Sequence, residues 1–116
     1  MGNYEGGKKE TIVVNFSERG LVTIEPNSKG ADTGDIIIWE CDYPFVVHFK
    51  GTSPVNKMII HSEYVKEEDK HIADATVVHN SERLGGVQGS YFIACPNGDR
   101  IDAADPEIIV PRDRRN

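Results

Sequence analysis

The sequence predicts an all-β domain, and three of its properties lead to that prediction. The chain has 116 residues, which fits one domain with one hydrophobic core. Its aliphatic residues are mostly branched at Cβ, with twelve Ile and eleven Val against two Leu. Such side chains have restricted χ1 rotamers and suit the pleated surface of a sheet. The apolar runs are short and bounded by turn residues, as in a sandwich or barrel.

The first strands are expected on either side of a turn. Segments 11–16 and 21–25 are separated by Ser-Glu-Arg-Gly, so they are predicted to pair. A loop at 26–33 follows. The next segment, 35–40, is apolar without interruption from Ile36 to Trp39. A run of this kind is typical of a strand that is covered on both faces, and it predicts a central strand.

A strand over 45–49 is expected after Pro44. Because successive side chains of a strand point to opposite faces, Phe45, Val47 and Phe49 share one face. His48 is then expected on the other face, away from the aromatic side chains.

The second half of the chain gives weaker patterns. Residues 57–61 suit a short strand, and 62–70 has a helix-capping Ser62 followed by helix-forming residues, which predicts a short helical segment. Further strands are expected at the segments 75–79, 90–94 and 107–110. The prediction is therefore a sandwich of seven to eight strands with one short helix.

The charge of the chain excludes some classes of partner. The formal net charge is −6 and the isoelectric point is about 5.1, so there is no positive field to attract nucleic acid or an anionic membrane. No apolar run is long enough to cross a bilayer, and the amino terminus has no signal-like apolar core. The expectation is a soluble protein, cytoplasmic if Met1 is the natural start, and periplasmic or secreted if a leader has been removed.

The domain is expected to span residues 10–111. Residues 1–9 are rich in Gly and charge and are predicted to be disordered, and 112–116 form a polar tail. A basic tail this short is typical of a solvated terminus.

Two segments resemble the halves of a blue-copper site. The first is GDIIIWECDYPFVVHF, residues 34–49, and the second is GSYFIACPNGDRIDAADPEIIV, residues 89–110. A strand that opens Gly-Asp and carries a Trp, followed by a loop Pro and a strand that ends in Phe, is similar to plastocyanins and pseudoazurins. The spacing of Gly89, Tyr91 and Cys95 also matches that family. The resemblance implies a cupredoxin-like Greek-key sandwich.

The ligands of that family are mostly missing. Its first His ligand follows the loop Pro, where this chain has Phe45. Gly98 and Ala103 stand near the positions of the second His and the Met, and no His or Met follows Cys95. A type-1 copper site needs two imidazoles and a thiolate, so the sequence predicts no such site and no cofactor.

The two cysteines leave three alternatives open. Cys41 and Cys95 are both placed by the resemblance at the pole where copper usually lies. They could be free buried thiols, which behave as small apolar residues. They could instead form a disulfide, if their Cα atoms lie within about 7 Å. A reactive or metal-bound pair is the third alternative.

A divergent metal site is a further alternative. Cys41 and Cys95 could be joined by one of the four histidines, because borderline metals accept mixed thiolate and imidazole ligands. The candidates are His48, His61, His71 and His79. No pair of these residues has the spacing of a known metal motif. The simpler interpretation is that each histidine is a surface or strand-edge residue.

The expected function is that of a noncatalytic binding or interaction domain. The sequence contains no nucleophile elbow, phosphate loop or metalloprotease pair, so no enzyme is predicted. The pole instead carries Tyr43, Pro44, Phe45 and Pro96, an apolar and aromatic set on loops, where binding function concentrates. The alternative is that Phe45 fills the vacant metal cavity. The partner, a protein or a small molecule, and a thiol redox role for Cys41 and Cys95 stay open.

Overall fold

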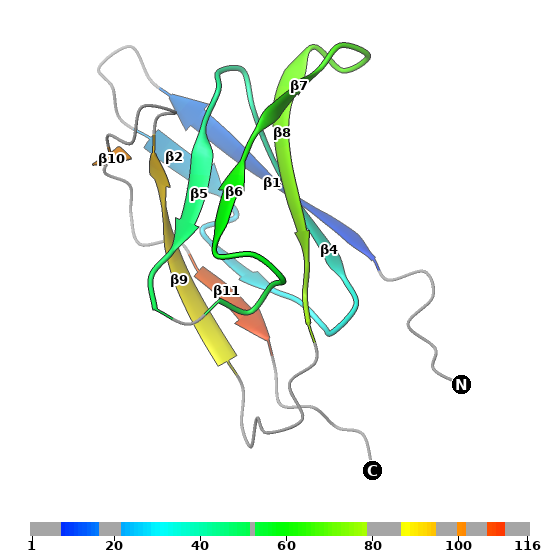
Figure 1. Cartoon of the computed structure of the whole chain (residues 1–116), viewed down its shortest axis with the longest axis vertical. Coiled ribbons are helices and arrows are strands. Elements are labelled where there is room, and N and C mark those ends of the chain that lie inside the picture. The colour runs from blue at the N-terminus through cyan, green and yellow to red at the C-terminus, as the bar shows by residue number, and fades with distance from the viewer. Residues whose placement is uncertain are drawn as a thin grey trace.

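The computed structural model describes residues 8–16, 22–51, 53–78, 87–94, 100–101 and 107–110. These residues form two β-sheets that lie face to face (Figure 1). They contain no helix, and so none that could cross a membrane. The strands are β1 (Lys9–Phe16), β2 (Val22–Glu25), β3 (Ser28–Gly30), β4 (Ile36–Cys41), β5 (Val46–Phe49), β6 (Ile59–His61), β7 (Glu63–Val65), β8 (Lys70–Thr76), β9 (Val87–Ala94), β10 (Arg100–Ile101) and β11 (Glu107–Val110). The all-β prediction is confirmed.

The first sheet has the strand order β2-β1-β4-β8-β7. Strands β1 and β2 pair antiparallel, as the sequence predicts, whereas β1 and β4 run parallel. In register, Ile12 lies beside Trp39, and Trp39 lies beside Ala73 on β8. All three side chains are at most 2% exposed, so they form one row of the core.

The second sheet has the order β3-β11-β9-β5-β6, and β10 pairs with the end of β9. Its parallel pair is β3 with β11; the other pairs are antiparallel. Val47 of β5 lies between Ile60 of β6 and Ile93 of β9. These three side chains are buried and face the first sheet.

Strand β4 is central, as predicted, because β1 and β8 lie on its two sides. The prediction that both of its faces are covered is wrong. Ile37, Trp39 and Cys41 are buried, but the residues between them are only half-buried. An unbroken apolar run therefore marks a strand in the middle of its sheet here, with one face in the core and the other turned outward.

The predicted helix at 62–70 is wrong. This segment forms β7, a turn over Lys66 to Asp69, and the start of β8. Amides in the turn donate to carbonyls three residues back, and Asp69 has a φ of 54°, which Asp tolerates better than most residues. A helix this short is marginal in water, whereas β7 gains strand pairing with β8.

The structure also has more strands than the seven or eight expected. The described residues form eleven, and four of these have only two or three residues: β3, β6, β7 and β10. Strands this short leave no detectable alternation in the sequence. The expected terminal segments fall largely outside the described residues.

The core is built around four aromatic side chains, Trp39, Phe45, Phe49 and Tyr91, each at most 1% exposed. Trp39 meets Tyr91 edge-on, with ring centroids 5.6 Å apart. Phe49 closes this group, with centroid distances of 6.2 Å to Trp39 and 5.4 Å to Tyr91. The sequence prediction that Phe45, Val47 and Phe49 share one face is confirmed.

Candidate functional site

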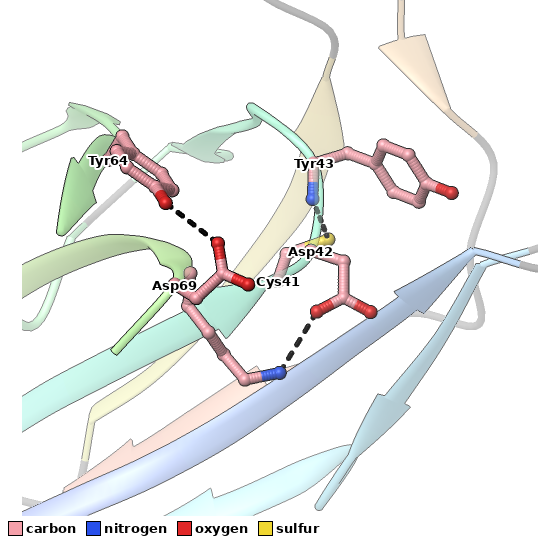
Figure 2. A network of polar contacts seen from close by, with 6 residues as sticks. Cys41, Asp42, Tyr43, Tyr64 and Asp69 are labelled. Atoms are coloured by element: carbon pink, nitrogen blue, oxygen red, sulfur yellow. Dashed lines mark hydrogen bonds and ion pairs between the residues drawn. The ribbon is translucent and has the colours of Figure 1, made fainter. Parts of the chain in front are cut away.

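Three strands and one loop meet at one end of the sandwich. Cys41, the last residue of β4, lies beside His71 of β8, and His71 lies beside Tyr64 of β7. The loop after β4 brings Tyr43 to the same end (Figure 2), and Pro44 is the next residue of this loop. We call this set, Cys41, Tyr43, Pro44, Tyr64 and His71, the tyrosine end.

Cys41 anchors the loop from inside. Its side chain is 2% exposed, and its Sγ accepts a hydrogen bond from the backbone N–H of Tyr43 at 3.4 Å. Burial raises the pKa of the Cys41 thiol, because the thiolate would lose its solvation; the nearby Asp42 carboxylate acts in the same direction. The thiolate is the reactive form of cysteine, so this thiol is a poor nucleophile at neutral pH.

The loop is fixed on its other side by Ser62. The N–H of Phe45 donates to Ser62 Oγ at 3.0 Å, and the N–H of Ser62 donates to the Phe45 carbonyl at 3.0 Å. Phe45 itself is 1% exposed and belongs to the core. The loop therefore holds Tyr43, which is 59% exposed, between two fixed points.

Tyr64 is held from the β7–β8 turn. Its hydroxyl donates to Asp69 Oδ1 at 2.7 Å, and its ring lies 5.3 Å from that of His71. The bond to the carboxylate raises the pKa of Tyr64, because it favours the protonated phenol. Tyr64 is 54% exposed, so the ring is oriented and still open to solvent.

An ion pair joins the loop to the start of β8. Lys70 Nζ lies 3.0 Å from Asp42 Oδ1, and this carboxylate raises the pKa of Lys70. The Asp42 side chain is 70% exposed. In Figure 2 the rings of Tyr43 and Tyr64 lie on either side of Cys41 and Asp42.

Only part of the predicted apolar pole lies at the surface. Tyr43 and Pro44 are exposed at the tyrosine end, whereas Phe45 is in the core and cannot contact a partner. Pro96 lies outside the described residues.

The structure does not bring Cys41 and His48 of the predicted metal site together. Cys41 points into the core from the first sheet, whereas His48 lies on the second sheet and stacks on Phe92, with centroids 4.7 Å apart. His48 is on the face opposite Val47, as predicted, so it is not brought toward Cys41. Within the described ranges, no three His, Cys, Asp or Glu side chains come together as a metal site.

Cys95, the third member of that alternative, lies outside the described residues. Cys41 is unbridged in the structure. The Cys41–Cys95 disulfide and a redox role for the pair stay predictions.

Sequence reasoning missed Tyr64 and Asp69, because both lie in the segment predicted as helical. The available signal was local. Tyr64 and Val65 are both strand-forming residues, and Asp69 is a residue that tolerates positive φ. They could have indicated a hairpin in place of the helix.

No protein-family model matches the chain, and no curated protein matches it. Among solved structures, the cysteine protease inhibitor EhICP2 from Entamoeba histolytica is similar, with a TM-score of 0.40 and 8% sequence identity. The alignment covers 89% of this chain and 95% of the inhibitor. This level of similarity defines neither a family nor a function.

Proposed function

We propose that this chain is a noncatalytic binding domain that contacts a partner protein through the tyrosine end. One observation carries the proposal: Tyr43 and Tyr64, 59% and 54% exposed, come from separate elements to one end of a rigid scaffold. Tyrosine is enriched in protein interfaces because its large ring buries much area while its hydroxyl still forms hydrogen bonds.

Preorganisation of this end supports the proposal. Ordering a loop or a side chain on binding costs free energy, and residues already held in place avoid that cost. The backbone N–H of Tyr43 donates to Cys41 Sγ, and the Tyr64 hydroxyl donates to Asp69. The Tyr43 backbone and the Tyr64 ring are therefore already held in place before a partner binds.

We further propose that the fold is a cupredoxin-like Greek-key sandwich. Its topology supports this: β4 lies next to β8 and β5 next to β9, so the strands between these neighbours leave the sheet and return. The chain also crosses between sheets from β2 to β3. Fold alone transfers no activity, and the binding proposal depends on the tyrosine end.

We also propose that the domain has no type-1 copper site. Phe45 stands where the resemblance expects an imidazole, and its ring is packed in the core. A phenyl ring has no donor atom for copper, so this position cannot supply the imidazole of a type-1 site.

Site-specific photo-cross-linking tests the binding proposal. A benzophenone amino acid replaces Tyr43 in one variant and Ile109 in a control, because Ile109 is 38% exposed on β11, away from the tyrosine end. In extracts of the source organism, the first variant should cross-link a defined protein that the control does not.

The purified partner then allows a quantitative test. Replacing both Tyr43 and Tyr64 by Ala should weaken its binding at least tenfold, as for interface hot spots, whereas Ile109→Ala should change it less than twofold. Equal binding by the double variant and the wild type would refute the proposed surface.

A further inference from the structure

The β7–β8 hairpin carries more carboxylates than lysines around Tyr64. Its acidic residues are Glu63, Glu67, Glu68 and Asp69, and its lysines are Lys66 and Lys70. Lys70 is already paired with Asp42 of the loop after β4. Within the described part of the chain, no lysine or arginine pairs with an acidic residue of the hairpin. The carboxylates near Tyr64 are therefore not neutralised by cations of the described chain.

Tyr64 presents an oriented ring to the solvent. Strand β7 is the last strand of its sheet, and Tyr64 is 54% exposed. Its hydroxyl is fixed by Asp69, and its ring lies against that of His71 with an angle of 54° between the ring planes (Figure 2). The face of a tyrosine ring is negative and attracts a cation. A cation can therefore stack on a ring that is already held in position.

Asp69 can accept further hydrogen bonds beside this ring. An ionised carboxylate accepts about four hydrogen bonds through its two oxygens. The Tyr64 hydroxyl occupies one of these positions at Oδ1, and Oδ2 has no donor among the described residues. Asp69 is exposed, so a donor from a partner can reach it. The ring and the carboxylate together suit a group that stacks and donates at the same time.

We propose that the partner of the tyrosine end places an arginine on the hairpin, with its guanidinium stacked on Tyr64 and hydrogen-bonded to Asp69. This inference rests on the proposed binding function and names the chemistry of its partner. A guanidinium is a planar cation whose several N–H donors lie in its plane, so it can stack on a ring and donate sideways to a carboxylate. A lysine ammonium is a point charge and cannot do both.

The charge of the domain favours a basic segment over other occupants. A second copy of the chain has the same net charge of −6, and nucleic acid is also anionic, so both are repelled. An apolar partner would bury the hairpin carboxylates without replacing their solvation. The one arginine among the described residues, Arg100, lies beside Ala94 in the second sheet and not on the hairpin. A basic segment instead complements the hairpin, and this complementarity also steers the encounter.

NMR titration of the full chain with short peptides tests the proposal. The probes are the capped peptide Gly-Arg-Gly-Arg-Gly and two versions with Lys or Glu in place of Arg. The Arg peptide should shift the amide resonances of the β7–β8 hairpin in a saturable manner at millimolar concentration. The Lys peptide should bind about threefold more weakly or less, because it lacks the stacked fork, and the Glu peptide should not bind.

Variants assign the contact to Tyr64 and Asp69. Tyr64→Leu and Asp69→Asn should each weaken binding of the Arg peptide about threefold or more, as for exposed cation–π and ionic contacts. Glu25→Gln is the matched control for charge, because Glu25 is exposed on β2, at the opposite edge of the same sheet, and it should leave binding unchanged. Circular dichroism should confirm that each variant keeps the wild-type fold.

Three results of the peptide experiment would overturn the inference. These are an absence of saturable shifts with the Arg peptide, equal binding of the Arg and Lys peptides, and an equal loss of binding in Glu25→Gln and Asp69→Asn. The last result would reduce the effect to the overall charge of the domain.

The purified partner separates this inference from the proposed function. Asp69→Asn should weaken partner binding about threefold or more, whereas Glu25→Gln should not. If the double Ala variant of Tyr43 and Tyr64 loses binding but Asp69→Asn does not, the arginine contact is wrong and the binding function stands. If the double variant binds as the wild type does, both are wrong.

Discussion

Trp39 and Tyr91 meet edge-on in the centre of the sandwich, and each buries a polar atom that lacks a conventional hydrogen bond. Trp39 Nε1 and the Tyr91 hydroxyl are both inaccessible to solvent and have no partner within bonding geometry. Burial raises the pKa of the Tyr91 hydroxyl, and the nearby indole N–H of Trp39 opposes this effect in part.

Tyr91→Phe should leave stability nearly unchanged or raise it by about 1 kcal/mol. A buried polar group without a good partner carries an uncompensated desolvation cost, which the variant removes. Urea denaturation at pH 7 measures the change. A loss of more than about 2 kcal/mol would mean that the hydroxyl has a strong partner, since removing a well-made bond leaves that partner unsatisfied.

Stability should fall at alkaline pH because of the same residue. Burial raises the pKa of Tyr91 to about 12, against 10 for the free side chain. Its contribution is complete below pH 10 and is lost as the pH rises toward 12, because only the unfolded chain ionises there. The loss amounts to about 2–3 kcal/mol, and Tyr91→Phe should lack this component in pH-dependent urea denaturation.

Gly89→Ala should destabilise the domain by about 1–3 kcal/mol through overpacking. A Cβ at Gly89 would lie 2.3 Å from Pro54 Cδ and 3.3 Å from Phe49 Cε1. Gly30→Ala is the control, because its Cβ would meet only the Ile109 carbonyl oxygen, at 3.9 Å. Thermal denaturation of both variants should separate them, and equal melting temperatures would contradict the expected clash.

Phe45→Ala should cost about 3–5 kcal/mol, as large-to-small changes of buried aromatic residues do. Phe45→Leu, which keeps most of the volume, should cost less. Chemical denaturation of the two variants tests the interior position. If Phe45→Ala costs less than about 1 kcal/mol, the ring contributes little to the core and could serve a surface role.

Asp69→Asn should lower the pKa of Tyr64 toward that of a free tyrosine. The Asp69 carboxylate holds the phenolic proton and so raises this pKa, and a neutral amide does so more weakly. NMR titration of the Tyr64 ring in the wild type and in the variant measures the shift. An unchanged Tyr64 titration in the variant would rule out the carboxylate as its cause.

Cys41 should react with a thiol reagent much more slowly in the native protein than in the urea-unfolded protein. Its side chain is buried and its pKa is raised, so both access and thiolate formation are limited. Cys95→Ser isolates Cys41 for this measurement, and Cys41→Ser provides the matched variant. Rapid native labelling of Cys41 would show that this end of the sandwich opens readily.

Local sequence patterns predicted the main strands that pack on the core. Alternation from Phe45 to Phe49 correctly separated Val47 from His48, because strand geometry fixes that separation residue by residue. The prediction of a helix over 62–70 was wrong. The composition of this segment favours a helix, but its conformation is decided by pairing with β8, and the local pattern contains no information about that pairing. The tyrosine end was found only in part, since Tyr64 depends on that hairpin.

The sequence by itself determined the all-β class and the central strand at Ile36–Cys41, since these depend on side-chain type and on short-range periodicity. Tertiary structure alone decided that Phe45 is buried while Tyr43 is exposed, and that His71 lies between Cys41 and Tyr64. The physical reason is that burial and cross-strand neighbours come from register between segments far apart in the chain, which no local pattern encodes.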